Sequence, residues 1–169
     1  MAFGTGTHSI TRLCLMSLED LMKPSLSVLD LGCGSGILAI AAAKMGASKV
    51  LAVVIDPVAA KITAENAEIN GVADSIVAQQ GSLETVRSSA RRFDLLLANI
   101  LARIIIEMCD QGLGDIVRPG GVAIFSGIIN EQVDDVRAAL SHAGYRVTYV
   151  RVEGDWVSIE ALRPFDGGE

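Results

Sequence analysis

The sequence has few cysteines and lacks the long apolar runs of a membrane protein. Its 169 residues contain only three cysteines, Cys14, Cys33 and Cys109, whose wide spacing fits neither a metal site nor a disulfide framework. This favours a reducing compartment and therefore a cytoplasmic location. No uninterrupted apolar run reaches the roughly 18 residues of a membrane span. The amino terminus lacks a basic stretch followed by an apolar one, so no secretory signal is predicted.

Basic residues are scarce as well, which argues against nucleic acid as a partner. The chain has 14 lysine and arginine residues against 20 aspartate and glutamate residues, a formal net charge of −6. The adjacent pair Arg91-Arg92 is too short to follow a phosphate backbone. Half of the residues are hydrophobic and the mean hydropathy is +0.43. Such a composition favours strands that are buried on both faces, as in a parallel sheet.

Strand-like and helix-like segments alternate along the chain, which predicts an α/β fold with a mostly parallel sheet covered by helices on both faces. Apolar runs predict strands at 26–31, 49–55, 75–79, 93–98, 122–126, 145–152 and 156–162. Helices are predicted at 10–22, 37–45, 57–70, 100–117 and 131–143. Between the last two strands, Glu153-Gly154-Asp155 is a hairpin signal that implies one antiparallel strand near the carboxyl terminus. We expect one domain over 1–165 and a tail over 166–169.

A glycine-rich turn follows the first predicted strand and reads Asp30-Leu31-Gly32-Cys33-Gly34-Ser35-Gly36. In open α/β sheets, ligands bind beyond the carboxyl ends of the strands, where glycines let the backbone approach them. The spacing is G-x-G-x-G, with Ile37 where a dinucleotide loop would place its third glycine, and this disfavours a nicotinamide dehydrogenase. The turn is therefore either a loop for another cofactor or a turn that allows tight packing of helix on strand.

An acidic residue before a G-x-G-x-G turn resembles motif I of the class I S-adenosylmethionine-dependent methyltransferases. Three more segments extend the resemblance: Ala-Phe-Gly-Thr-Gly-Thr-His at 2–8, Asn-Ile-Leu-Ala at 99–102 and Asp-Trp-Val-Ser at 155–158. In this order and spacing, from Ala2 to about Pro164, the chain is similar to the methyltransferase domain of the ribosomal protein L11 methyltransferase (PrmA) family. The lysine methyltransferase of the electron-transfer flavoprotein beta subunit is similar in the same domain.

The resemblance implies a Rossmann-like, seven-stranded fold that transfers a methyl group from S-adenosylmethionine to lysine or α-amino groups, expected to be those of a ribosomal protein. Asn99 would touch cofactor and substrate and orient the attacking amine, which makes it the candidate catalytic residue. Phe3 and His8 would form part of the wall where the substrate enters. The residues assigned to the cofactor are Thr11, Asp30, Gly32, Gly34, Gly36, Val54, Asp56 and Asn99.

The chain departs from the family pattern at the end of the second strand. Family members carry Asp-x-Asp-Pro there, and the first aspartate binds the ribose hydroxyls, whereas this chain reads Val54-Ile55-Asp56-Pro57. Losing one charged hydrogen-bonding partner is expected to weaken cofactor binding by about 1.5–3 kcal/mol. Asp56 lies on the same strand face as Val54 and could reach the cofactor. Because Pro57 follows it, a role as helix cap is favoured.

The family's amino-terminal substrate-recognition domain is absent from these 169 residues. Two alternatives to a protein methyltransferase therefore stay open: a small-molecule methyltransferase and a non-catalytic module with the same fold. Glutamine methylation is disfavoured because that family carries Asn-Pro-Pro-Tyr where this chain has Asn99-Ile100-Leu101-Ala102. Trp156 is expected to be a core residue, since large aromatic side chains are mostly buried.

Overall fold

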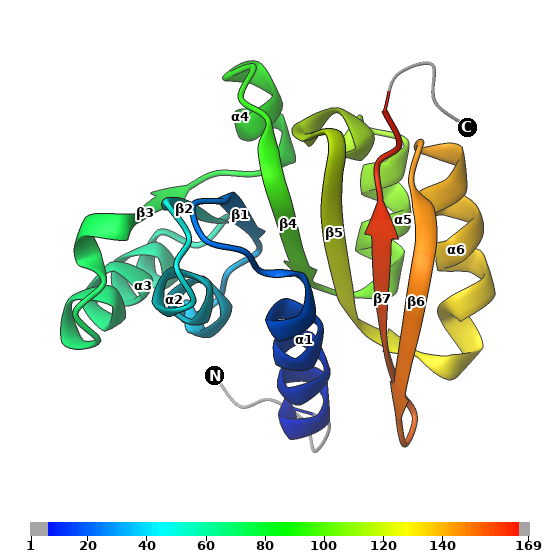
Figure 1. The fold of residues 1–169 in the computed structure, drawn as a ribbon, viewed down its shortest axis with the longest axis horizontal. Coiled ribbons are helices and arrows are strands. Elements are labelled where there is room, and N and C mark those ends of the chain that lie inside the picture. The colour runs from blue at the N-terminus through cyan, green and yellow to red at the C-terminus, as the bar shows by residue number, and fades with distance from the viewer. Residues whose placement is uncertain (1–6, 166–169) are drawn as a thin grey trace.

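The computed structural model describes residues 7–165, which form one seven-stranded sheet with helices on both faces (Figure 1). The strands are β1 (Ser27–Leu31), β2 (Lys49–Val54), β3 (Ile76–Gln80), β4 (Phe93–Asn99), β5 (Val117–Ile129), β6 (Arg146–Glu153) and β7 (Trp156–Leu162). Their order is β3-β2-β1-β4-β5-β7-β6. The first five strands are parallel, and β7 runs antiparallel to both β5 and β6. The predicted seven-stranded, mostly parallel sheet is confirmed.

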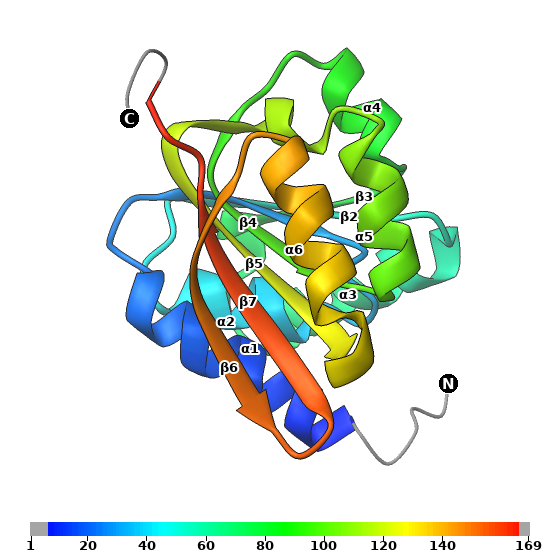
Figure 2. The same ribbon diagram turned by 90° about the vertical axis from the view of Figure 1, so that its right-hand side faces the viewer.

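Within the described part of the chain, six α-helices cover the sheet, three on each face. They are α1 (Thr7–Leu21), α2 (Ile37–Lys44), α3 (Pro57–Ile69), α4 (Leu83–Ser88), α5 (Ala102–Cys109) and α6 (Val133–His142). Because side chains alternate across a strand, Val28 of β1 belongs to the core cluster that includes residues of α1, α2 and α3, while Leu29 belongs to the one that includes residues of α4, α5 and α6. Figure 2 shows α5 and α6 on one side of the sheet and α1 and α2 on the other. None of the helices within residues 7–165 is long and apolar enough to cross a membrane.

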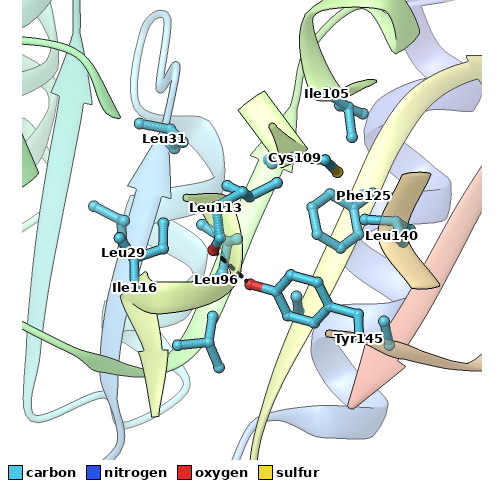
Figure 3. Close-up of a cluster of buried hydrophobic side chains, with 14 of the residues drawn as sticks. Leu29, Leu31, Leu96, Ile105, Cys109, Leu113, Ile116, Phe125, Leu140 and Tyr145 are labelled. Carbon is cyan, nitrogen blue, oxygen red and sulfur yellow. Dashed lines mark hydrogen bonds between the residues drawn. The ribbon is translucent and has the colours of Figure 1, made fainter. Parts of the chain in front are cut away.

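The core on the α5–α6 side is organised around Tyr145 (Figure 3). Its ring meets that of Phe125 edge to face, with the centroids 5.6 Å apart. Its hydroxyl group donates a 2.9 Å hydrogen bond to the carbonyl oxygen of Leu113, and burial raises the pKa of this phenol. This hydrogen bond connects the turn before β5 to the segment after α6. It therefore fixes the position at which β5, the neighbour of β4, begins.

The helix predicted over 100–117 is wrong in its second half. The helix α5 ends at Cys109, a 3-10 turn follows at Leu113–Ile116, and β5 begins at Val117. Val117 pairs with Phe93 of β4, so tertiary pairing overrides the apolar pattern that suggested a longer helix. The segment Pro119-Gly120-Gly121 lies inside β5, where the ladder with β4 shifts register. Proline and glycine are tolerated at such bulges.

Candidate functional site

A cavity of about 310 Å³ opens beyond the carboxyl ends of β1 and β4. These neighbouring strands lie where the strand order reverses direction, between β3-β2-β1 and β4-β5, which is the usual ligand position in an open α/β sheet. Its wall is built from α1, the loop after β1, α2, the end of β4, β5 and β7. The lining residues are Ile10, Thr11, Asp30, Gly32, Cys33, Gly34, Ser35, Ile37, Leu38, Asn99, Ile100, Leu101, Gly127 and Trp156.

Among the residues that the structure describes, Asp30 is the only charged one in this wall. It is 1% exposed, and its Oδ2 atom has no hydrogen-bond partner among the described residues. Burial raises the pKa of Asp30 from its ordinary 3.8 to about 7, an effect that the backbone N–H of Ala39 partly offsets. An unpartnered buried carboxylate oxygen is costly, and in a cavity wall it marks a place for a cationic or N–H-bearing ligand group.

The glycine-rich loop after β1 is held in place by two side chains of α3. Thr63 Oγ1 donates a 2.8 Å hydrogen bond to the carbonyl oxygen of Gly34, and Asn66 Nδ2 donates one of 2.9 Å to that of Ser35. Gly34 has φ +57 and open space around its Cβ position, so the backbone there is free to meet a ligand. Sequence reasoning missed Thr63 and Asn66, although their spacing of three places them on one helix face.

The third glycine of the motif serves packing, because a Cβ atom on Gly36 would lie 2.7 Å from the Thr63 methyl carbon. Gly36 does not line the cavity. Cys33 does line it, and burial raises the pKa of its thiol to about 11. This cysteine is therefore protonated at neutral pH and unsuited to act as a nucleophile.

Asn99 ends β4 and is half-buried in the cavity wall. Its side chain does not cap α5, because Leu101 occupies the N-cap position and that helix has no side-chain cap. Opposite Asn99, β5 has a bulge between Phe125 and Ile128 that contains Gly127 at φ +86. A Cβ atom on Gly127 would lie 3.2 Å from Asn99 Oδ1 and 2.9 Å from the carbonyl oxygen of Ile100. The bulge therefore makes room for two oxygen atoms at the cavity.

The variant Gly127→Ala is expected to displace the Asn99 amide, because the added methyl group would need the space that Asn99 Oδ1 and the Ile100 carbonyl occupy. If Asn99 aligns a substrate, turnover should fall about tenfold while the affinity for the cofactor changes little. Steady-state kinetics that separate kcat from KM would show this. The control is Gly71→Ala, which has the same left-handed backbone (φ +74) but no atom within 4 Å of its Cβ position. Equal losses in both variants would mean that backbone strain alone is responsible.

Trp156 and Thr11 complete the wall from the other side. Trp156 is the first residue of β7, is only half-buried and lines the cavity, so the expectation that it is a core residue is wrong. It faces the ligand space because β7 begins at the carboxyl edge of the sheet, opposite Ile129 of β5. Thr11 and its neighbour Ile10 come from α1. Their placement agrees with the interpretation of Thr11 as a cofactor contact, which stays a prediction.

Two further assigned residues, Val54 and Asp56, lie outside the cavity wall. Val54 is the half-buried last residue of β2, and its carbonyl oxygen accepts a 2.9 Å hydrogen bond from the N–H of Gly81. Asp56 is exposed, and its Oδ1 accepts a 2.9 Å hydrogen bond from the N–H of Val58, which confirms the predicted helix cap. Phe3 lies outside the described residues, and His8 lies in the first turn of α1, where only the backbone is described.

Comparisons with known proteins identify what the chain resembles. It matches the family model "Ribosomal protein L11 methyltransferase (PrmA)" over residues 1–164. It is 47% identical over 161 residues to the ribosomal protein L11 methyltransferase of Pelotomaculum thermopropionicum, covering 95% of this chain and 51% of that protein. For the protein of that name from Herpetosiphon aurantiacus, the identity is 43% over 182 residues, covering 97% and 56%. The chain thus spans about half the length of the curated relatives it matches.

Solved structures show the same fold. The ribosomal protein L11 methylase of Lactobacillus delbrueckii subsp. bulgaricus superposes with a TM-score of 0.85 at 34% identity, covering 94% of this chain and 81% of that one. An RNA methyltransferase of Salinibacter ruber, solved with S-adenosyl-L-homocysteine, has a TM-score of 0.72 at 20% identity and covers 96% and 94%. At that identity, the second likeness concerns the fold alone.

Proposed function

We propose, from the premise that the chain belongs to the ribosomal protein L11 methyltransferase (PrmA) family, that it methylates lysine or α-amino groups of a ribosomal protein with S-adenosylmethionine as donor. The observation that carries the proposal lies within the matched residues. A single cavity at the reversal of strand order has the buried carboxylate of Asp30 and the amide of Asn99 in its wall. We further propose that residues 1–165 form the catalytic domain of this enzyme.

The cavity fits the cofactor chemically. S-adenosylmethionine carries a cationic amino group and a sulfonium, and Asp30 Oδ2 is a buried acceptor with no partner within residues 7–165. The carboxylate group of the cofactor suits the amino-terminal end of α2, which follows the open backbone of Gly34. Thr11, Asp30 and the glycine loop are the residues we expect to hold it. When bound, the cofactor supplies an electrophilic methyl group.

The residues of the chain would then align and desolvate the acceptor amine. A lysine ammonium, with a pKa of about 10.4, has no lone pair until it loses its proton. The cavity wall includes the apolar side chains of Ile10, Ile100, Leu101 and Trp156, and such apolar surroundings lower the pKa of an amine by disfavouring its charged form. Asn99 Oδ1 and the carbonyl oxygen of Ile100, which meet beside Gly127, are the acceptors we expect to direct an amine N–H and so orient its lone pair.

Mass spectrometry of ribosomal protein L11 incubated with the chain and isotope-labelled S-adenosylmethionine tests the proposal. We expect labelled methyl groups on lysine side chains or the amino terminus, and about tenfold to a hundredfold less label with the Asp30→Asn variant at limiting cofactor. Binding of S-adenosylmethionine without transfer to protein would favour a small-molecule acceptor. An absence of cofactor binding would leave the fold as a non-catalytic module and contradict the proposal.

The cofactor affinity should respond to the residue at the end of β2. The variant Val54→Asp restores the carboxylate that the family resemblance assigns to the ribose hydroxyls, and we expect it to tighten S-adenosylmethionine binding about tenfold to a hundredfold. Isothermal titration calorimetry measures the change. The control Val77→Asp adds the same charge to an exposed position of β3. Equal affinities of wild type and Val54→Asp would show that this carboxylate is not needed here.

A further inference from the structure

Two segments that are far apart in the sequence meet beside the cavity, namely the first turns of α1 and the end of β6 (Figure 2). Glu153, the last residue of β6, contacts both ends of one short stretch of α1. Its Oε2 accepts a 2.9 Å hydrogen bond from Ser9 Oγ, and its Oε1 lies 3.1 Å from Arg12 Nε. Ser9 and Arg12 flank Ile10 and Thr11, the two α1 residues of the cavity wall. One carboxylate therefore holds the stretch of helix that faces the cavity.

The same glutamate is fixed to the opposite part of the wall. Glu153 pairs across the β6–β7 ladder with Trp156, which lines the cavity. The turn between these strands is itself tied to the end of β5. The N–H of Asn130 donates a 3.0 Å hydrogen bond to the carbonyl oxygen of Asp155, and its Nδ2 donates one of 3.2 Å to that of Gly154. The hairpin is therefore a fixed support to which Glu153 attaches α1.

The two halves of α1 are held differently. The second half packs through fully buried residues such as Leu18 and Ser17, and Arg151 of β6 donates to Ser17 Oγ at 3.1 Å. In the first half, Ile10 and Thr11 are only partly buried, and the Arg12 side chain is 70% exposed. Leu13 is the buried apolar anchor of this half, and Glu153 adds polar contacts near the amino-terminal end, which salt can screen.

We infer that Glu153 is a positioning residue, which latches the first turns of α1 onto the β6–β7 hairpin and so keeps Ile10 and Thr11 in the cavity wall. The latch itself follows from the contacts of Ser9 and Arg12. Its effect on cofactor affinity rests on the proposed function. Breaking it should open the wall next to Trp156 without unfolding the sheet, because the second half of α1 keeps its buried contacts.

Trp156 is the only tryptophan of the chain, so its fluorescence reports on this wall without a label. In the ligand-free protein, Glu153→Gln should shift the emission to longer wavelength and raise the acrylamide quenching constant about twofold. Because Glu153 neighbours Trp156 directly, Arg12→Gln is the decisive variant, since it breaks the latch from the α1 side and should give the same change. Arg137→Gln, an exposed arginine of α6, is the control.

Glu153→Gln and Arg12→Gln should weaken binding of S-adenosylhomocysteine about threefold to tenfold, whereas the control Arg137→Gln should not. A concentration of 0.5 M NaCl should reduce the difference in affinity between the wild type and the first two variants. Fluorescence in Arg12→Gln equal to that of the wild type and the control would overturn the latch. Altered fluorescence with unchanged S-adenosylhomocysteine affinity would overturn its role in positioning the wall for the cofactor. If no protein, wild type included, binds S-adenosylhomocysteine, the proposed function fails, while the fluorescence still decides the latch.

Discussion

The variant Asn99→Ala is expected to lower the turnover number about a hundredfold, while the affinity for S-adenosylmethionine changes by much less. The amide lies at the carboxyl end of β4, and its Oδ1 borders the Gly127 bulge together with the carbonyl oxygen of Ile100. An acceptor amine that loses this alignment must find the attack geometry by chance, and misplacement by about 1 Å can cost a hundredfold in rate. Single-turnover kinetics with labelled cofactor separate this loss from binding.

The matched control is Asn70→Ala, which removes an exposed amide at the end of α3, away from the cavity wall. It should leave turnover unchanged. Turnover in Asn99→Ala equal to that of the wild type would remove Asn99 from the mechanism. A loss of cofactor affinity as large as the loss of turnover would assign Asn99 to cofactor binding alone.

Asp30→Asn should weaken cofactor binding and stabilise the ligand-free fold at the same time. Removing the charge that faces a cationic ligand should lower its affinity about tenfold to a hundredfold. The carboxylate is buried with one unpartnered oxygen, so an uncharged amide at this place avoids the cost of ionisation. The pKa of Asp30, raised from 3.8 to about 7, means that its ionised form destabilises the folded wild type above pH 7. The Asp30→Asn variant avoids this cost and is expected to gain at most on the order of 4 kcal/mol in the free energy of unfolding.

The pH dependence of both properties follows from the same pKa. Between about pH 4 and pH 7 the folded chain holds a proton on Asp30 that the unfolded chain has lost, so the Asp30 contribution to stability falls as pH rises through this range. Affinity for the cationic cofactor should rise over the same range, because only the ionised carboxylate pairs with it. Urea unfolding and calorimetric titration from pH 5 to 8 measure the two trends. Trends in Asp30→Asn equal to those of the wild type would show that another group is responsible.

The parts of the site that are local in sequence could be predicted from it. Asp30 and the glycine loop form one continuous motif after an apolar strand, which predicts a ligand site at that edge of the sheet. Asn99 was assigned from the family resemblance, and its place at the end of a second apolar strand puts it at the same edge. The cap at Asp56 was predicted for the same reason, because Pro57 follows it directly. The strands were predicted well where apolar runs end in glycine or proline.

The parts that depend on long-range packing could not be predicted. Gly127 matters because a bulge in β5 brings it against Asn99, and no local pattern marks that approach. Trp156 lines the cavity only because β7 inserts between β5 and β6. Thr63 reaches the glycine loop through the packing of α3 on β2 and β3. The helix expected to end at Val117 ends at Cys109 instead, because Val117 pairs with Phe93 in the sheet.

A crystal structure of the chain with S-adenosylhomocysteine is the most direct test of the central claim, that the cavity between β1 and β4 is the cofactor site. The claim predicts the amino group of the ligand at Asp30 Oδ2, its carboxylate group against the loop around Gly34, and its sulfur atom turned toward Asn99. A cavity without ligand density at saturating concentration, or a ligand bound elsewhere on the molecule, would contradict it.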